Sequence, residues 1–169
     1  MPSEWYDIRE NRVLRNANST WRWYDAMGPE VVKYVTNFEA LATDDTSGDP
    51  TEWTMTVVEV GGTSTAVLTT TKGGALLVTA AGNEDDGANL QLKGEAFQLS
   101  GDHPCYFGAS FAINDVDQVD AILGLCITDT TLLGGLTDGV YFRTVDESAT
   151  LQFVIEKNSV ESATNVATL

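Results

Sequence analysis

The feature that most constrains this chain is the regular spacing of turn signals after Trp53. Short segments rich in Val, Thr, Ile, Phe and Tyr are separated by clusters of Gly, Asp and Asn about every 8–12 residues. Those apolar and β-branched residues favour extended strands, and the clusters favour turns. No helical periodicity lies between the segments. The sequence therefore predicts an all-β fold, arranged as a sandwich or barrel.

About nine strands are expected from this spacing. The apolar run at 105–113 is expected to be a central strand, and Leu151, Phe153 and Ile155 are expected to share one face of theirs. No fixed-period repeat is present, which argues against a solenoid or propeller. The expected strands cover residues 53–60, 65–71, 75–81, 88–93, 95–99, 105–113, 121–127, 139–145 and 149–156.

Residues 1–52 have a different character from the rest of the chain. They show little alternation, and three of the four tryptophans fall within them before residue 24. The charge pattern of residues 7–15 predicts a short helix, with Asp7 near its start and Arg15 near its end. We therefore expect an irregular, partly helical N-terminal arm over 1–52, followed by a β-sandwich domain over 53–169.

The net charge of −16 is unevenly distributed along the chain. Acids and bases balance in the first 35 residues, so the remainder carries the whole negative excess. A strongly acidic protein lacks the cations that neutralise phosphates, which argues against nucleic-acid binding. No long apolar run predicts a membrane span, and the N-terminus carries no visible secretory signal.

The arm interleaves aromatic residues with arginines, which is the composition of interface hot spots. Single-stranded nucleic acid can also be bound by such a mixture, but the equal number of acids in the arm disfavours that. Two interpretations of the arm follow: it docks onto a neighbouring subunit, or it folds back and covers one end of its own sandwich. The candidate partner-binding residues are Trp5, Tyr6, Arg9, Arg12, Arg15, Trp21, Arg22, Trp23 and Tyr24.

Candidate catalytic groups are few, and we expect no enzyme. The only histidine, His103, lies in a predicted turn beside Ser100, Asp102 and Cys105, and neighbours in a turn rarely converge on one locus. Glycoside hydrolysis would need two opposed acids in a cleft. Acids within predicted strands are Glu95 and Glu156, whose simplest role is on the solvent face of a sheet.

Metal and disulfide chemistry are weakly indicated. Residues 83–87 and 115–120 concentrate oxygen ligands suited to calcium, but neither segment has the EF-hand spacing, so we expect no metal and no cofactor. Cys105 and Cys126 lie in apolar runs and are expected to be buried free thiols. A bridge between them stays open as the alternative.

Several stretches between residues 73 and 158 together resemble a known family in their order and spacing. The chain resembles bacteriophage virion proteins that have a concanavalin-like (LamG-like) jelly roll, of the head decoration or cement type. That resemblance implies a jelly-roll β-sandwich for the body. The stretches are 74–79, 86–91, 124–130, 138–143 and 153–158.

The resemblance also implies a function. It implies a non-enzymatic virion protein, made in the host cytoplasm, that binds the major capsid protein as a homotrimer and stabilises the outer surface of the shell. Sandwiches of this family usually continue beyond residues 167–169, so we expect the final strands to be missing and sheet edges to be open for a partner chain. The alternative is a glycan-binding, lectin-like module of a tail fibre or host-recognition structure.

Overall fold

The structure, a computed structural model, confirms the all-β class. The chain divides into two compact units, Met1–Thr36 and Asn37–Leu169, while the expected division after residue 52 stays a prediction. Antiparallel sheets and one four-residue helix make up the regular elements of the described part. The structure describes residues 4–8, 11–15, 24–27, 34–38, 40, 51–58, 64–68, 74–83, 86–94, 97–99, 105–115 and 118–169.

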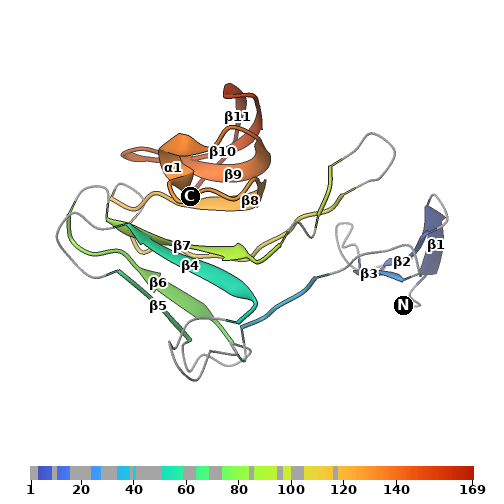
Figure 1. Cartoon of the computed structure of the whole chain (residues 1–169). Coiled ribbons are helices and arrows are strands. Elements are labelled where there is room, and N and C mark those ends of the chain that lie inside the picture. Colours follow the sequence, from blue (N-terminus) through green and yellow to red (C-terminus); the bar gives the residue numbers. More distant parts are fainter. Residues whose placement is uncertain are drawn as a thin grey trace. The chain divides into compact units, whose positions relative to one another are not determined.

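The N-terminal unit contains a three-stranded antiparallel sheet, drawn in blue in Figure 1. Its order is β1 (Glu4–Ile8), β2 (Asn11–Arg15) and β3 (Tyr24–Met27). The helix predicted over 7–15 is therefore wrong. The register offers a physical reason, because it sets Glu4 opposite Arg15 and Asp7 opposite Arg12. Residues of opposite charge at opposed positions stabilise a strand pair as effectively as charges at the ends of a short helix.

Two strand pairs open the second unit. β4 (Trp53–Val58) pairs with β7 (Gly87–Leu92), and β5 (Thr65–Leu68) pairs with β6 (Leu76–Thr79). These confirm the strands predicted near 53–60, 65–71, 75–81 and 88–93. The strand predicted at 95–99 is not present over 97–99, and residues 95 and 96 lie outside the described part.

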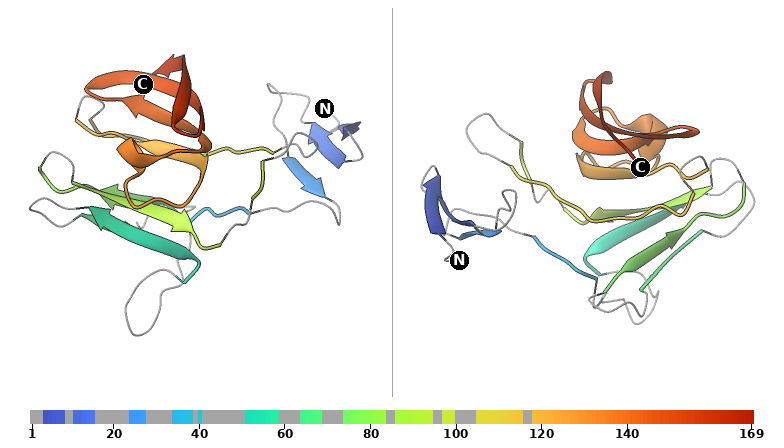
Figure 2. Two further views of the ribbon diagram at one scale, coloured as in Figure 1. Left: turned by 45° about the horizontal axis from the view of Figure 1, so that its top comes forward. Right: turned by 180° about the vertical axis from the view of Figure 1, so that it is seen from behind.

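The largest sheet lies at the C-terminal end and is drawn in orange to red in Figures 1 and 2. Its antiparallel order is β11-β10-β9-β8. Three of its strands confirm predictions near 121–127, 139–145 and 149–156. The three are β8 (Ile122–Cys126), β9 (Gly139–Val145) and β10 (Ser148–Lys157). The fourth strand, β11 (Val160–Thr168), was not predicted.

The described core is small and lies on one face of the C-terminal sheet. Tyr141 and Val154, which are opposite each other in β9 and β10, are 3% and 0% exposed. They pack with Leu136, and Ile122 and Leu132 pack against this cluster. Because Leu132 begins α1 (Leu132–Gly135) and Leu136 follows it, the short helix covers this face of the sheet.

The other face of the C-terminal sheet is also apolar. Leu151, Phe153 and Ile155 lie opposite the alternating positions Thr144, Phe142 and Val140 of β9, which confirms that they share one face. The rings of Phe142 and Phe153 are 5.4 Å apart between centroids. Apolar residues on both faces are typical of a sheet that other parts of a protein cover on each side.

The apolar run at 105–113 is not the central strand predicted from its composition. Its residues have no regular structure, and Tyr106, Phe107 and Phe111 are exposed. A strand needs a partner strand for its backbone groups, and no described strand pairs with this segment. Cys105 and Cys126 are free thiols, as expected, but both are exposed, so the prediction that they are buried is wrong.

The β7 strand is tied to the loop that follows β8. The Asn89 side-chain amide donates to the carbonyl of Thr130 over 3.2 Å. The Gln91 side-chain amide nitrogen donates to the carbonyl of Asp129 over 2.8 Å, and its oxygen accepts from the Asp129 N–H over 3.2 Å. These contacts join the β4–β7 pair to the C-terminal sheet. In the described part, no helix has the length and apolar character of a membrane-crossing segment.

Candidate functional site

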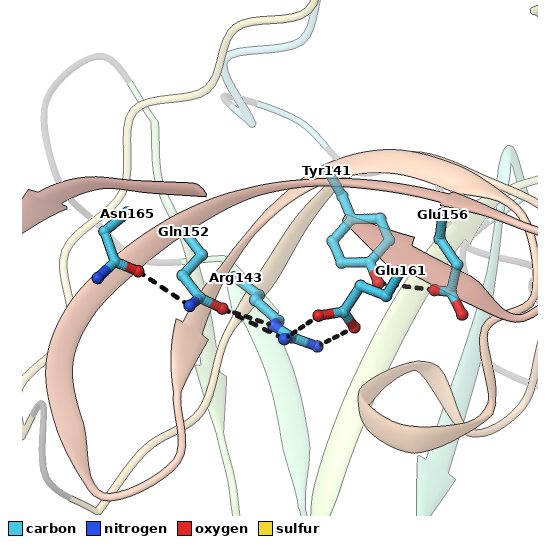
Figure 3. A network of polar contacts seen from close by, with 6 residues as sticks. All are labelled: Tyr141, Arg143, Gln152, Glu156, Glu161 and Asn165. Atoms are coloured by element: carbon cyan, nitrogen blue, oxygen red, sulfur yellow. Dashed lines mark hydrogen bonds and ion pairs between the residues drawn. The ribbon is translucent and has the colours of Figure 1, made fainter. Parts of the chain in front are cut away.

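The most developed polar site is a cluster on the C-terminal sheet, shown in Figure 3. We call it the edge cluster, because it reaches from β9 through β10 to the outermost strand β11. The strand register brings its members together, since Arg143 lies opposite Gln152, and Gln152 lies opposite Asn165. The edge cluster consists of Tyr141, Arg143, Gln152, Glu156, Glu161 and Asn165.

Arg143 is the centre of the edge cluster and contacts both later strands. Its Nη1 and Nη2 donate to the two carboxylate oxygens of Glu161 over 2.7 and 2.5 Å. Its Nε and Nη2 also donate to Gln152 Oε1 over 3.3 and 3.2 Å. This two-point geometry is specific to a planar guanidinium, which presents several donors in a fixed fork.

The Gln152 side chain extends this chain of contacts to β11. Its Nε2 donates to Asn165 Oδ1 over 2.9 Å. Glu161 and Asn165 therefore hold β11 at two positions, one through Arg143 and one through Gln152. The cluster fixes the register of the edge strand with side-chain contacts as well as backbone ones.

The other half of the cluster is a phenol–carboxylate pair. Tyr141 Oη donates to Glu156 Oε2 over 2.8 Å. Burial raises the pKa of Tyr141 well above its usual range, and the hydrogen bond to Glu156 and its negative charge raise it further. The phenol therefore stays protonated at neutral pH and serves as a donor to Glu156.

A small cavity of about 80 Å³ lies between the edge cluster and the α1 region. That volume admits a few water molecules and is too small for a sugar ring. The guanidinium, the phenol and both carboxylates already have partners within the cluster. The arrangement therefore supports a role in positioning β10 and β11. The lining residues are Ile122, Leu132, Leu133, Gly134, Leu136, Tyr141, Arg143, Glu156 and Glu161.

A larger apolar hollow of about 280 Å³ lies on the opposite face of the sheet. The 105–113 segment contributes Phe107 and Phe111 to it, and the sheet contributes Leu123, Phe142 and Leu151. The exposed aromatic rings of the segment lie at its rim, with Phe107 42% and Phe111 38% exposed. Its lining suits an apolar side chain of another protein better than a polar ligand.

The candidate arm residues are only partly described. Trp5 and Tyr6 lie in β1, Arg12 and Arg15 in β2, and Tyr24 in β3. The register sets Leu14 opposite both Trp5 and Tyr24, so these two aromatic residues lie on the two strands that neighbour Leu14, one on each side of it. The remaining candidates lie outside the described residues, and their role stays a prediction. They are Arg9, Trp21, Arg22 and Trp23.

Only two of the candidate catalytic residues, Cys105 and Glu156, lie in the described part of the chain. His103, Ser100, Asp102 and Glu95 lie outside the described residues. Cys105 is exposed, and Glu156 belongs to the edge cluster. An acid that the sequence interpretation overlooked, Glu161, lies directly opposite Glu156, but Arg143 neutralises it.

The two acidic turns are incompletely described. In the first, Asn83 Nδ2 donates to Asp86 Oδ2 over 3.1 Å, while residues 84 and 85 lie outside the described part. In the second, residues 116 and 117 lie outside it. Among described residues, no group of three or more His, Cys, Asp or Glu side chains is arranged to hold a metal ion.

Sequence reasoning missed the edge cluster because four of its six residues lie on two strands, β9 and β10, whose positions the spacing of turns predicted but whose pairing it did not. The cross-strand meeting of Arg143 with Glu161 needs β11, which was not predicted. The available signal was Asn158-Ser159, a turn-forming pair that directly follows the alternating segment 151–156.

Comparisons with family models, with curated proteins and with solved structures find no match to this chain. The function of this protein is therefore inferred from its residues and their arrangement, together with its resemblance to phage virion proteins.

Proposed function

We propose that this protein is a structural component of a phage virion, a decoration protein that binds the major capsid protein on the outer surface of the shell and stabilises it. The observation that carries the proposal is the amount of exposed apolar side chain on an acidic body. The body is proposed to be a jelly-roll sandwich whose outer sheet is β8–β11, with the homotrimer as its working form.

Exposed apolar residues occur in many segments of the described part, and two groups of them lie along 105–113 and on β11. Along 105–113, Tyr106 is 64% exposed and accompanies Phe107 and Phe111. On β11, Val160 is 72% exposed and Val166 is also exposed. Exposed apolar surface in this amount is typical of protein–protein contacts, where burying it stabilises the assembly. This supports a protein that completes its packing against other subunits.

The charge distribution supports the same function. All of the net charge of −16 lies beyond the balanced first 35 residues. An acidic body facing solvent keeps assembled particles apart by mutual repulsion. The balanced, aromatic arm is the part suited to burial against another subunit, because aromatic residues and arginine dominate interface hot spots.

The test uses the full chain and particles of the phage that encodes it. Particles are prepared with wild-type protein and with a Trp21→Ala/Trp23→Ala double variant, and the bound copies per particle are counted by quantitative mass spectrometry. The expected result is wild-type protein on the particle and a large loss of the variant. A Gln98→Ala variant, altered at an exposed position of the body, serves as the control and should bind normally.

Absence of the wild-type protein from purified particles would contradict the proposed function. Normal occupancy by the double variant would contradict only the role given to the arm. Electron microscopy of the same particles then shows whether the bound density lies at the three-fold positions expected of a trimer.

A glycan-binding module of a tail fibre is the second candidate, favoured by one observation. Tyr106 presents an exposed aromatic ring, and aromatic faces are common platforms for sugars. A glycan array with the purified protein and a Tyr106→Ala variant tests it. Saturable binding that the variant loses would favour the glycan module over the decoration protein.

A further inference from the structure

β11 is an edge strand with an unusual length of available backbone. It lies at one end of the order β11-β10-β9-β8, and β10 is the strand with which it pairs in the described part. All nine of its residues are exposed. An edge strand of this kind presents a row of N–H and C=O groups to any chain that can pair with it.

The hairpin turn determines which groups of β11 point outward. Asn158 and Ser159 both have positive φ, 52° and 60°, and they join the opposed residues Lys157 and Val160. In such a two-residue turn the flanking pair exchanges its backbone hydrogen bonds, and bonded and non-bonded pairs then alternate. The backbone groups of Glu161, Ala163 and Asn165 therefore point away from β10.

The turn itself is held in place by contacts with the residues before β9. Ser159 N–H donates to the carbonyl of Thr137 over 2.9 Å. Asp138 Oδ1 accepts from the Asn158 N–H over 3.4 Å and forms an ion pair with Lys157 over 3.3 Å. With the edge cluster holding Glu161 and Asn165, β11 is fixed before any partner arrives, which lowers the entropy cost of pairing.

β11 also lacks most of the devices that keep edge strands apart. Natural edges are protected by lysines, prolines, short length or bulges. β11 contains no lysine or proline, and its one charged residue, Glu161, is neutralised by Arg143 of its own sheet. The one irregularity of its pairing with β10 lies beyond Asn165, so residues 160–165 form a regular ladder.

We propose that β11 pairs antiparallel with β11 of a second copy of this chain, about a two-fold axis at Ala163. Outward-facing residues must pair with outward-facing residues, so the axis can pass through any residue from Glu161 to Asn165. An axis at Ser162 would set Glu161 opposite Ala163, which offers the carboxylate no donor, and an axis at Thr164 would already pair residues beyond Asn165, in the irregular end of β11. An axis at Glu161 would set two carboxylates opposite each other. An axis at Asn165 would extend the pairing into the irregular end of β11.

An axis at Ala163 avoids these problems. It sets Glu161 of one copy opposite Asn165 of the other, so that an amide faces a carboxylate at both ends of the contact. A small residue at the axis lets the strands approach closely. The two four-stranded sheets then become one continuous sheet. The surface is self-complementary, as a two-fold contact requires.

This contact goes beyond the proposed function and does not depend on it. It is compatible with a three-fold assembly, because an icosahedral shell has two-fold positions between neighbouring three-fold positions. There, β11 would join one group of copies to the next.

The sharpest test is a cysteine trap in a Cys105→Ser/Cys126→Ser background, which removes the two exposed native thiols. Ala163→Cys places two thiols at the axis, about 5.5 Å apart between Cα atoms, within reach of a disulfide. Ser162→Cys is the matched control, because its two copies would lie about 8 Å apart. Each variant is oxidised mildly and run on a denaturing gel without reductant.

The expected result is a covalent dimer of Ala163→Cys with little dimer from Ser162→Cys. One engineered thiol per chain yields a covalent dimer whatever the number of subunits in solution. Cross-linking of Ser162→Cys equal to or greater than that of Ala163→Cys, or none of either, would overturn the two-fold contact at Ala163.

A second measurement does not rely on disulfide chemistry. Ala163→Lys sets two cations opposite each other at the axis, while Thr128→Lys makes the same charge change at an exposed residue away from β11. Sedimentation equilibrium should give a dissociation constant at least about fivefold weaker for Ala163→Lys than for wild type or Thr128→Lys. Identical association of all three proteins would contradict the proposal.

Discussion

Arg143 is the residue on which the outer half of the C-terminal sheet most depends. It lies in β9, yet its guanidinium reaches Gln152 of β10 and Glu161 of β11. The Arg143 and Glu161 side chains are 29% and 35% exposed, so the pair is partly shielded from solvent. A shielded two-point ion pair is stronger than an exposed single contact.

We expect Arg143→Ala to lower the free energy of unfolding by about 1–2 kcal/mol, because four hydrogen bonds are lost and Gln152 and Glu161 keep unpaired groups. Urea unfolding followed by circular dichroism measures the change. The control is Lys157→Ala, which removes an exposed single ion pair with Asp138 and should change stability by less than about 0.5 kcal/mol. Equal effects would show that the two-point geometry contributes nothing special.

Tyr141 makes the fold sensitive to alkaline pH. Its pKa is raised in the folded state, mainly by burial, so the folded protein holds this proton more tightly than the unfolded chain does. The stabilisation is complete below the ordinary tyrosine pKa of about 10 and is lost progressively as pH rises above it. Urea midpoints between neutral pH and pH about 11 should therefore fall more steeply for wild type than for Tyr141→Phe. Parallel curves would contradict this assignment.

At the scale of single elements, β8 can pair closely with β9 only because residue 124 is glycine. A Cβ atom built on Gly124 would lie 2.6 Å from the carbonyl oxygen of Val140, closer than atoms of folded proteins approach. It would also overlap the backbone of Tyr141. The glycine therefore leaves room for the backbone and Cβ of Tyr141.

Gly124→Ala should destabilise the protein by about 2–4 kcal/mol, since β8 must move away from β9 to admit the methyl group. Thermal unfolding by calorimetry measures the loss. Gly108→Ala is the matched control, because nothing lies within 4 Å of the added methyl group, and it should leave the melting temperature nearly unchanged. A small effect at Gly124 would indicate that β8 is not packed against β9 as described.

The turn between β10 and β11 should tolerate glycine better than its present residues. Ser159 has φ of 60°, a left-handed conformation that costs a side-chain-bearing residue free energy and glycine none. Ser159→Gly should therefore raise stability by about 0.5–1 kcal/mol, measured as a higher urea midpoint. Ser162→Gly, within β11, should do the opposite. A loss of stability at residue 159 would argue against the left-handed turn.

The success of sequence reasoning also differed by element. Strands with strong alternation or clear glycine and aspartate boundaries, such as β9 and β10, were predicted close to their observed bounds. β11 was missed because its Ser, Ala, Thr and Asn residues carry little apolar periodicity, and its exposure explains why they need none. The run at 105–113 was misinterpreted because composition reports preference for a strand and says nothing of a partner strand.

The candidate site was harder to predict than the strands. Arg143 and Glu161 are far apart in the sequence, and they meet only because a hairpin brings β11 back beside β10. The helix predicted at 7–15 failed for a related reason. Its charged residues were interpreted along one segment, whereas the register places them on two opposed strands.

For the whole molecule, the acidic excess determines how copies approach each other. Repulsion between bodies opposes self-association at neutral pH, and salt or protonation of carboxylates weakens it. Solubility should be lowest near the isoelectric point of about 4.1. Light scattering across pH should show a maximum there, and added salt at neutral pH should raise the apparent mass. Scattering independent of both would contradict the role of charge in keeping copies apart.

The reach of Arg143 has a consequence for local opening. In the described part, β11 is held through β10, through the guanidinium of Arg143 and through the turn contacts at residues 137–138. Amide exchange should therefore be slowest in β9 and become faster toward β11. Loss of this one side chain would let the last hairpin fluctuate as a separate cooperative unit, so the strand that offers its edge to a partner would also be the first to fray.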